Sequence, residues 1–260
     1  MERKTILSAQ LLGIGYKAKK ESIIIAENID IQLKAGSLTA LIGANGIGKS
    51  SLLRTLTGIQ APLSGSVLLN NQPVNQYTPP QLAQQLALVL TEALPPGNLT
   101  VYDLVALGRQ PYTNWLGSLS AEDKAIVSNA LQATDIEYLA HKKHYELSDG
   151  QLQKALIARA LAQDTPLIVL DEPTTHLDLP NKASLLQLLK KLALEQDKCI
   201  LYSTHDLDLA LQLSDEIIIM KKEAIAQGIP TQLIEKKAFD NLFEGESVVF
   251  DYSTKTFRVK

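Results

Sequence analysis

The chain has 260 residues, 45% of them hydrophobic, which is enough for one large α/β domain or two small ones with a substantial core. Its 25 basic and 28 acidic side chains give a net charge of −3, so no overall positive field points to a nucleic-acid partner. The single cysteine, Cys199, excludes an internal disulfide and is expected to be a buried, inert thiol in a reducing, cytoplasmic setting. Residues 1–17 make a poor signal peptide, and nowhere do about 18 apolar residues run together, so no membrane-spanning helix is predicted.

The first third of the chain is predicted to be rich in β-structure. Apolar runs bounded by turn residues predict strands at 23–25, 29–33, 38–42 and 66–71, with a turn at 34–36 and one helix that begins at residue 50. Glycines and a proline between residues 58 and 65 separate that helix from the next strand.

The middle of the chain is predicted to be helical, and the chain then returns to alternating strands and helices. Helices are expected at 80–83, 101–107, 121–134, 151–162 and 182–194, and strands at 86–90, 167–170, 199–203 and, more weakly, 247–250. The alternation of strand and helix predicts an α/β fold with a parallel sheet. We expect a single domain over 1–260, with a core at about 1–90 and 160–225, a helical lobe at about 91–159 and a tail at 226–260.

A glycine-rich loop follows the apolar strand at 38–42. Residues 43–50 read Gly-Ala-Asn-Gly-Ile-Gly-Lys-Ser, a complete phosphate-loop motif with a strand before it and a helix after it. The glycines let backbone N–H groups turn toward an anion, the helix N-terminus faces the same way, and the lysine adds a positive charge. The motif therefore predicts a nucleoside triphosphate held by Gly43, Ala44, Asn45, Gly46, Ile47, Gly48, Lys49, Ser50 and Ser51, with the Ser50 hydroxyl on Mg²⁺.

Two carboxylates end the strand at 167–170. Asp171 and Glu172 lie where α/β sheets place their ligands, at the carboxyl end of an apolar strand. Asp171 is placed to hold Mg²⁺, and Glu172 to accept the proton of the water that attacks the γ-phosphate. The two residues form a Walker B arrangement.

A third motif carries a resemblance to a known family. Leu147-Ser148-Asp149-Gly150-Gln151 precedes a predicted helix and resembles the L-S-G-G-Q signature of ATP-binding-cassette ATPases. Other family landmarks follow in order over nearly the whole chain: Tyr16 at the position of the adenine-stacking aromatic residue, Thr175-His176-Leu177-Asp178 like the D-loop, and Ser203-Thr204-His205-Asp206 like the switch-histidine region.

The resemblance implies a P-loop cassette with a RecA-like parallel core, an N-terminal antiparallel β piece and an inserted helical lobe. Such cassettes work as head-to-tail dimers, in which Ser148, Gly150 and Gln151 of one chain meet the ATP held by Lys49 of the other. Glu172 would be the general base, His205 would contact the γ-phosphate, and Asp178 would link the two sites.

Two positions depart from the family pattern. Asp149 stands where the signature has its first glycine, and we expect its carboxylate to point away from the triphosphate. The glutamine that reaches Mg²⁺ and senses the membrane partner should follow the strand at 86–90, where this chain has Thr91 and Glu92. We assign the metal contact to Thr91, with Glu92 as the alternative.

A segment of the predicted helical lobe indicates which class of ATP-binding-cassette ATPase the chain resembles. Residues 98–112 contain Thr-Val-Tyr-Asp-Leu-Val-Ala-Leu-Gly-Arg-Gln-Pro, which resembles the T-V-x-x-L-V-x-x-G-R-x-P segment of bacterial importer ATPases for iron-siderophore complexes, haem and vitamin B12. That implies an integral-membrane permease bound through residues of about 91–116, a substrate-binding protein acting indirectly, no nucleic-acid partner and a location on the inner face of the cell membrane. The alternatives are an exporter cassette, a soluble cassette ATPase that remodels a complex, for example in iron–sulfur assembly, and a degenerate cassette that only binds nucleotide.

Overall fold

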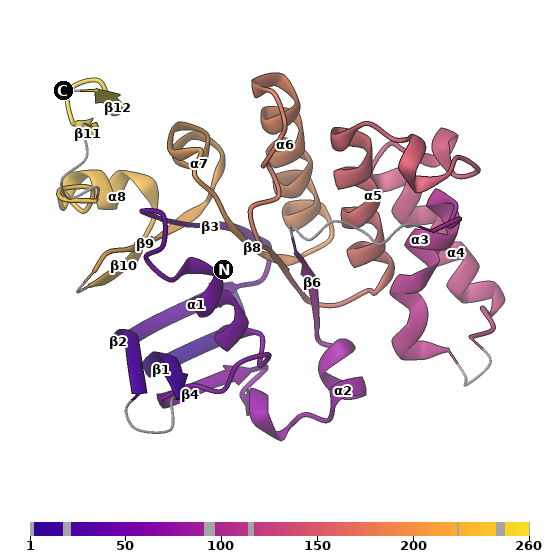
Figure 1. Ribbon diagram of the computed structural model, residues 1–260, viewed down its shortest axis with the longest axis horizontal. Helices are drawn as coiled ribbons and strands as arrows, with labels where there is room; N and C mark the ends of the chain where they lie inside the picture. The colour runs from indigo at the N-terminus through magenta and orange to yellow at the C-terminus, as the bar shows by residue number, and fades with distance from the viewer. Residues whose placement is uncertain are drawn as a thin grey trace.

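The central element of the molecule is a six-stranded sheet with the strand order β10-β9-β3-β8-β7-β6 (Figure 1). The computed structural model describes residues 3–17, 22–90, 97–113, 117–222, 224–242 and 248–259. All neighbouring strands of this sheet are parallel except the pair β9 and β10, which confirms the predicted parallel sheet. Its strands are β3 (Ser37–Gly43), β6 (Leu86–Val89), β7 (Leu167–Leu170), β8 (Cys199–Ser203), β9 (Glu216–Met220) and β10 (Ile225–Gly228).

Both faces of this sheet are covered, and alternate residues of each strand enter two separate cores. In β3, Ala40 and Ile42 pack into one core and Leu41 into the other. Side chains of a strand point alternately to its two faces, and a parallel sheet is buried on both. The first core includes α6 (Leu179–Glu195) and the helical lobe, and the second includes α1 (Lys49–Leu56) and the N-terminal sheet.

The N-terminal strands form a second, antiparallel sheet in the order β2-β1-β4-β5. The predicted strands at 23–25 and 29–33 are one strand in the structure, and β1 was not predicted. Both are irregular: Leu11 and Asn28 have positive φ, and the pairing of β1 with β2 shifts register between Ala9 and Ile14. These irregularities interrupt the alternation by which strands are recognised. The strands are β1 (Thr5–Lys17), β2 (Ser22–Lys34), β4 (Ser64–Leu69) and β5 (Gln72–Pro73).

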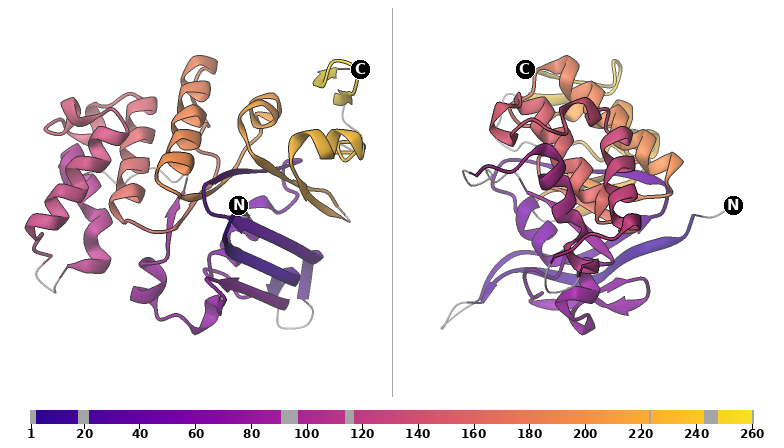
Figure 2. Two further views of the ribbon diagram at one scale, coloured as in Figure 1. Left: turned by 180° about the vertical axis from the view of Figure 1, so that it is seen from behind. Right: turned by 90° about the vertical axis from the view of Figure 1, so that its right-hand side faces the viewer.

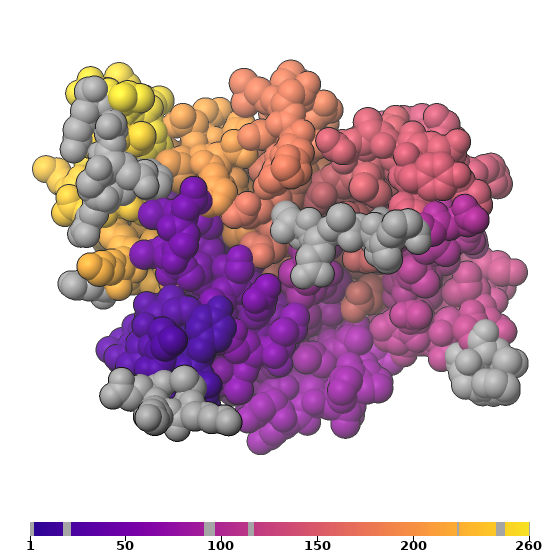
Figure 3. Space-filling model, in the orientation of Figure 1, coloured from indigo at the N-terminus to yellow at the C-terminus, as the bar shows by residue number. Residues whose placement is uncertain are grey.

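The helical lobe packs at the β6 side of the central sheet, across the molecule from the antiparallel sheet (Figures 2 and 3). Its helices pack on one another, and their buried side chains are part of the first core. The lobe contains α3 (Val101–Ala106), α4 (Ala121–Ala133) and α5 (Asp149–Ala162), with 3₁₀ turns at Leu107–Tyr112, Glu137–Leu139 and His144–Glu146. The helix α2 (Pro79–Ala83) and a 3₁₀ turn at Val74–Gln76 come before β6. His141 and His144 lie in a lysine-containing stretch, which predicts that both are solvated. His144 is instead buried, and its Nδ1 lies 3.3 Å from the Leu99 carbonyl oxygen.

The tail forms a small cap beside α7 (Leu207–Leu213). It contains α8 (Pro230–Glu235) and a hairpin of β11 (Val248–Asp251) and β12 (Thr256–Val259). Phe250 lies with its ring centroid 4.7 Å from that of Phe239 and 4.9 Å from that of Phe257, and these rings join the first core. Among the described residues, every helix is too short or too polar to cross a bilayer.

Candidate active site

The phosphate loop, the pair Asp171 and Glu172, and His205 lie at the carboxyl ends of three neighbouring strands. The phosphate loop follows β3, Asp171 and Glu172 follow β7, and His205 comes two residues after β8. Because β8 lies between β3 and β7, the three segments come together at one edge of the sheet. In α/β proteins this edge is where ligands bind.

The phosphate loop is held in the conformation that its glycines predict. Gly46 and Gly48 have φ of 73° and 111°, values that side chains with a Cβ seldom adopt. A Cβ on Gly43 would lie 2.6 Å from the Met220 carbonyl oxygen, so the loop and β9 need a glycine there. The helix α1 begins directly after Gly48, and its first N–H groups remain available to an anion.

Lys49 lies inside the loop. Its side chain is 6% exposed, and its Nζ donates to the carbonyl oxygens of Gly43 at 2.9 Å and Ala44 at 3.2 Å. Burial lowers the pKa of the ammonium, and the negative charges of Glu172 and Asp171 oppose that shift. The two carboxylates are therefore close enough to act on the lysine, as expected for one shared site.

Tyr16 connects the N-terminal sheet to the start of α1. Its hydroxyl lies 3.0 Å from the Ser51 Oγ, and the residue is 46% exposed. The hydrogen bond fixes the ring beside the phosphate-loop helix while part of the ring stays open to solvent. The stacking of an adenine base on this ring, which the family resemblance implies, stays a prediction.

Glu172 and His205 form a pair beside the phosphate loop. The His205 Nε2 and the Glu172 Oε1 are 2.5 Å apart, and the Thr175 Oγ1 donates to the other carboxylate oxygen at 3.3 Å. Glu172 has a φ of 49°, the left-handed region that side chains with a Cβ seldom occupy. Strained backbone of this kind is typical of functional sites, where surrounding contacts hold it in place.

The signature residues lie elsewhere in the same chain. Ser148 caps α5 by accepting from the Gln151 N–H at 3.4 Å, and Asp178 caps α6 by accepting from the Asn181 N–H at 3.1 Å. A Cβ on Gly150 would lie 3.8 Å from Asn181, so the two helix starts adjoin. They border a cavity of about 250 Å³. In Figures 1 and 2, α5 stands apart from α1, so one chain does not bring its signature to its own phosphate loop.

The carboxylate oxygens of Asp171 and the hydroxyl oxygen of Ser50 are ligands that fit a magnesium ion. Asp171 uses Oδ1 to accept from Ser203, and among the described residues its Oδ2 has no hydrogen-bond partner. The described part of the chain contains no group of three His, Cys, Asp or Glu side chains that could hold a metal by themselves. Mg²⁺ needs no such cage, because it keeps waters and takes one or two protein oxygens together with substrate phosphates. Thr91 and Glu92 lie outside the described residues.

Three residues that hold this site were given no role from the sequence, although Ser203 begins the switch-histidine motif. The Thr174 hydroxyl and the Lys182 ammonium each donate to the Asp206 carboxylate at 2.8 Å, and so anchor the loop that carries His205. Ser203 contacts both carboxylate residues that follow β7. Their residue types carried no signal, because serine, threonine and lysine are common at strand and helix ends.

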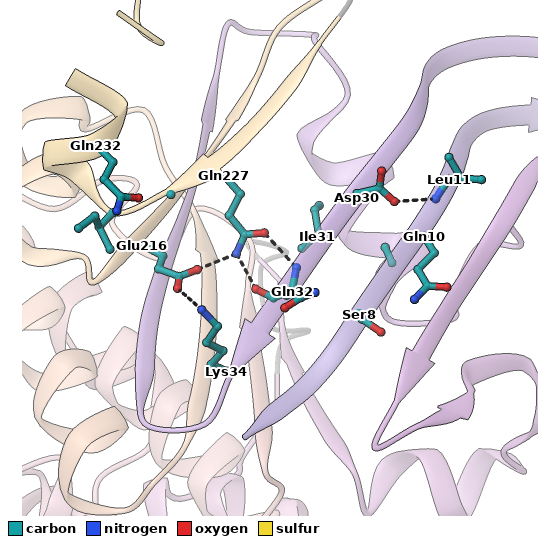
Figure 4. A pocket seen from close by; sticks show the side chains of 13 residues that line it. Ser8, Gln10, Leu11, Asp30, Ile31, Gln32, Lys34, Glu216, Gln227 and Gln232 are labelled. Carbon is teal, nitrogen blue, oxygen red and sulfur yellow. Dashed lines mark hydrogen bonds and ion pairs between the residues drawn. The ribbon is translucent and has the colours of Figure 1, made fainter. Parts of the chain in front are cut away.

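A second hollow, of about 820 Å³, lies between the antiparallel sheet and β10 (Figure 4). Several of its polar groups are paired with one another: Lys34 with Glu216 at 2.9 Å, and Gln227 with Glu216 and the Gln32 backbone. Glu216 begins β9, at the opposite end of the sheet from the phosphate loop. Groups already satisfied in this way offer little to a ligand, so this hollow is not the candidate site.

Comparisons with known proteins agree with this assignment. The ABC transporter family model matches residues 26–175, more than half of the chain, and an AAA domain model matches residues 143–211. The achromobactin transport ATP-binding protein of Dickeya dadantii is 38% identical over 92% of this chain and 88% of its own length. The ferric enterobactin transport ATP-binding protein of Escherichia coli is 35% identical over 94% of this chain and 89% of its own length.

Solved structures share the whole fold. A dimeric ATP-binding cassette in a post-hydrolysis state, bound to ADP and Pi, has a TM-score of 0.73 with 28% identity and covers 86% of this chain and 99% of that one. The N-terminal antiparallel sheet, the parallel core and the helical lobe thus form a cassette fold. Because the family model and the relatives span most of the sequence, the chain belongs to the ABC transporter family, as one of its ATP-binding ATPase subunits.

Proposed function

We propose that this chain hydrolyses Mg²⁺-ATP at a site completed by a second copy of itself, and that hydrolysis drives an importer of iron-siderophore, haem or vitamin B12. The observation that carries the catalytic part is the Glu172 and His205 pair, 2.5 Å apart beside the phosphate loop. A carboxylate held in this way is placed to take a proton from an attacking water.

Each residue of the site has a role in this reaction. Lys49 and the loop N–H groups bind the β- and γ-phosphates. Glu172 accepts the proton of the attacking water, and His205 orients that water. Ser50 and Asp171 would hold Mg²⁺, with Thr91 as the further ligand, and the ion would neutralise negative charge on the phosphates. Because Lys49 is already buried among loop carbonyls, it is pre-organised for an anion.

A second copy of the chain supplies the signature residues that complete each nucleotide site. Ser148, Gly150 and Gln151 lie at the start of α5, apart from the phosphate loop of the same chain. In a head-to-tail dimer they reach the partner's nucleotide, and a second helix N-terminus then faces the triphosphate. Asp178 links the two sites from the start of α6. The dimeric form of a similar cassette supports this arrangement.

The transport role rests on the lobe and on the relatives. The described part of the permease-binding segment holds α3 and the turn Leu107–Tyr112, with Leu107 and Tyr112 each 39% exposed. Relatives named for achromobactin and ferric enterobactin transport favour an iron-siderophore cargo. The chain then works on the inner face of the cell membrane, bound to a permease that receives cargo from a binding protein.

Purification of the tagged chain from its native cells, with and without detergent, tests the transport role. We expect a multi-span membrane protein to be recovered in stoichiometric amount only with detergent, and mass spectrometry to place it with an iron-siderophore binding protein. A soluble partner instead of a membrane protein would contradict the importer assignment and favour a remodelling ATPase.

The position of Tyr16 gives a prediction for nucleotide affinity. Replacing it by alanine removes a ring on which a base can stack, a contact worth about 1–3 kcal/mol. We expect the dissociation constant for ATP, measured by fluorescence titration, to rise roughly 5-fold to 150-fold. Tyr16→Phe is the matched control, because it keeps the ring and removes only the hydrogen bond to Ser51. Equal affinity of Tyr16→Ala and wild type would exclude the stacking role.

A further inference from the structure

Ser203 is a polar residue in an otherwise apolar strand. It ends β8, it is fully buried, and the run before it, from Cys199 to Tyr202, is buried as well. In the sheet β8 lies between β3 and β7, and Ser203 is level with Leu41 of β3, two residues before the phosphate loop. Ser203 therefore lies between the strand that leads to the phosphate loop and the strand that leads to Asp171 and Glu172.

The hydroxyl of Ser203 bonds to both carboxylate residues. Its Oγ donates to the Asp171 Oδ1 at 2.6 Å and accepts from the Glu172 backbone N–H at 2.8 Å. The direction of both bonds is fixed, because a carboxylate only accepts and a backbone N–H only donates. One hydroxyl thus sets the orientation of the Asp171 carboxylate and ties down the backbone of the residue that follows it.

Each bond has a consequence for the site. Because Oδ1 of Asp171 is occupied, Oδ2 is the oxygen left for a cation that accompanies the phosphates. The bond to the Glu172 N–H holds a residue whose φ is 49°, and that backbone conformation directs the carboxylate toward His205. Without the hydroxyl, the Asp171 carboxylate would be free to turn and the strained backbone would lose one of its restraints.

We propose that Ser203 is a positioning residue for ATP hydrolysis, which orients Asp171 toward Mg²⁺ and anchors Glu172 as the base. This inference rests on the proposed function and adds a residue to it. Outer-shell partners of this kind change metal affinity or activity by about 10-fold to 100-fold when they are removed.

The test compares Ser203→Ala with Ser214→Ala. Ser214 is a suitable control because it is also buried, 6% exposed, and its Oγ bonds to the hydroxyl of Tyr202, the residue before Ser203, at 2.9 Å. We expect Ser203→Ala to lower kcat about 10-fold to 100-fold, to raise the Mg²⁺ concentration needed for half-maximal turnover, and to change KM for ATP little. Ser214→Ala is expected to keep wild-type kinetics.

Binding measurements separate positioning from general damage. Affinity for a fluorescent ATP analogue is measured with Mg²⁺ and with EDTA. Mg²⁺ should raise the affinity of Ser203→Ala much less than it raises that of the wild type, while in EDTA the two affinities should agree within about 2-fold. Ser203→Thr keeps an Oγ and should restore most of kcat and of the Mg²⁺ effect. Thermal unfolding of all variants checks that they are folded.

Three outcomes would overturn the inference. One is a Ser203→Ala variant with the kinetics and Mg²⁺ dependence of Ser214→Ala, and another is an equal loss of affinity with and without Mg²⁺. The third is a Ser203→Thr variant that is folded and as impaired as Ser203→Ala. A wild-type chain that binds no Mg²⁺-ATP would instead overturn the proposed function together with the inference.

Discussion

Glu172→Gln is expected to bind ATP about as tightly as the wild type and to hydrolyse it about 10²- to 10⁴-fold more slowly. Glutamine keeps the size of the side chain and can still bond to His205, but it cannot accept a proton from water. Phosphate release measures the turnover and fluorescence titration measures the binding. Since ATP would be bound but not consumed, light scattering should also detect more dimer with ATP than in the wild type.

Glu216→Gln is the matched control for that variant. Glu216 is a partly buried glutamate at the amino end of β9, paired with Lys34 and far from the phosphate loop. Its loss should leave turnover unchanged. The histidine gives a second check: if Glu172 and His205 act as a unit, the double variant with His205→Ala should be little slower than Glu172→Gln alone. Wild-type turnover in Glu172→Gln would show that the assigned base is wrong.

Much of this site could be predicted because its motifs follow strands that are continuous apolar runs. Strands of that kind have clear ends, so the phosphate loop and the pair Asp171 and Glu172 could be placed at one edge of the sheet before the structure was known. The roles given to individual residues, such as Gln151 or Asp178, remain predictions.

Other features depend on contacts that the sequence does not display. His144 looked like a solvated histidine among lysines, and its burial follows from a contact with Leu99, 45 positions away in the chain. The strand β1 was missed because its bulges shift the alternation of apolar residues. Ser203 was noted only as the first residue of the switch-histidine motif, and its contacts with Asp171 and Glu172 follow from the pairing of β7 with β8. In each case the missing information is a long-range partner.

Arg109→Ala is expected to destabilise the helical lobe strongly. Arg109 is 6% exposed; its Nε donates to the Asp123 Oδ1 at 2.8 Å, its Nη1 donates to the Ala162 carbonyl at 2.9 Å, and its Cζ lies 4.0 Å from the ring centroid of Tyr112. One side chain thus joins the start of α4, the end of α5 and the turn Leu107–Tyr112. Removing one partner of a buried ion pair costs about 3–5 kcal/mol, because the other charge stays buried.

Urea unfolding at neutral pH measures this loss, with Lys191→Ala as a control. Lys191 forms an exposed pair with Glu195 at 3.9 Å, and exposed pairs contribute at most about 1 kcal/mol. Removing both buried charges, as in Arg109→Leu with Asp123→Asn, should cost less than Arg109→Ala alone, since no unpaired charge remains. A double variant less stable than Arg109→Ala would contradict the assignment of the cost to the orphaned carboxylate.

The Asp123 carboxylate also makes the stability of the helical lobe depend on pH. The Ser120 hydroxyl and N–H donate to Asp123 at 2.7 and 2.9 Å, and these bonds, with the smaller contribution of Arg109, lower its pKa from 3.8 to about 2. A folded-state pKa below the unfolded value stabilises the fold above about pH 4, and this contribution is lost as the pH falls toward 2. Asp123→Asn has no such group to titrate. Its unfolding free energy should therefore fall less than that of the wild type over this range, and parallel curves for the two proteins would show that Asp123 is not the group responsible.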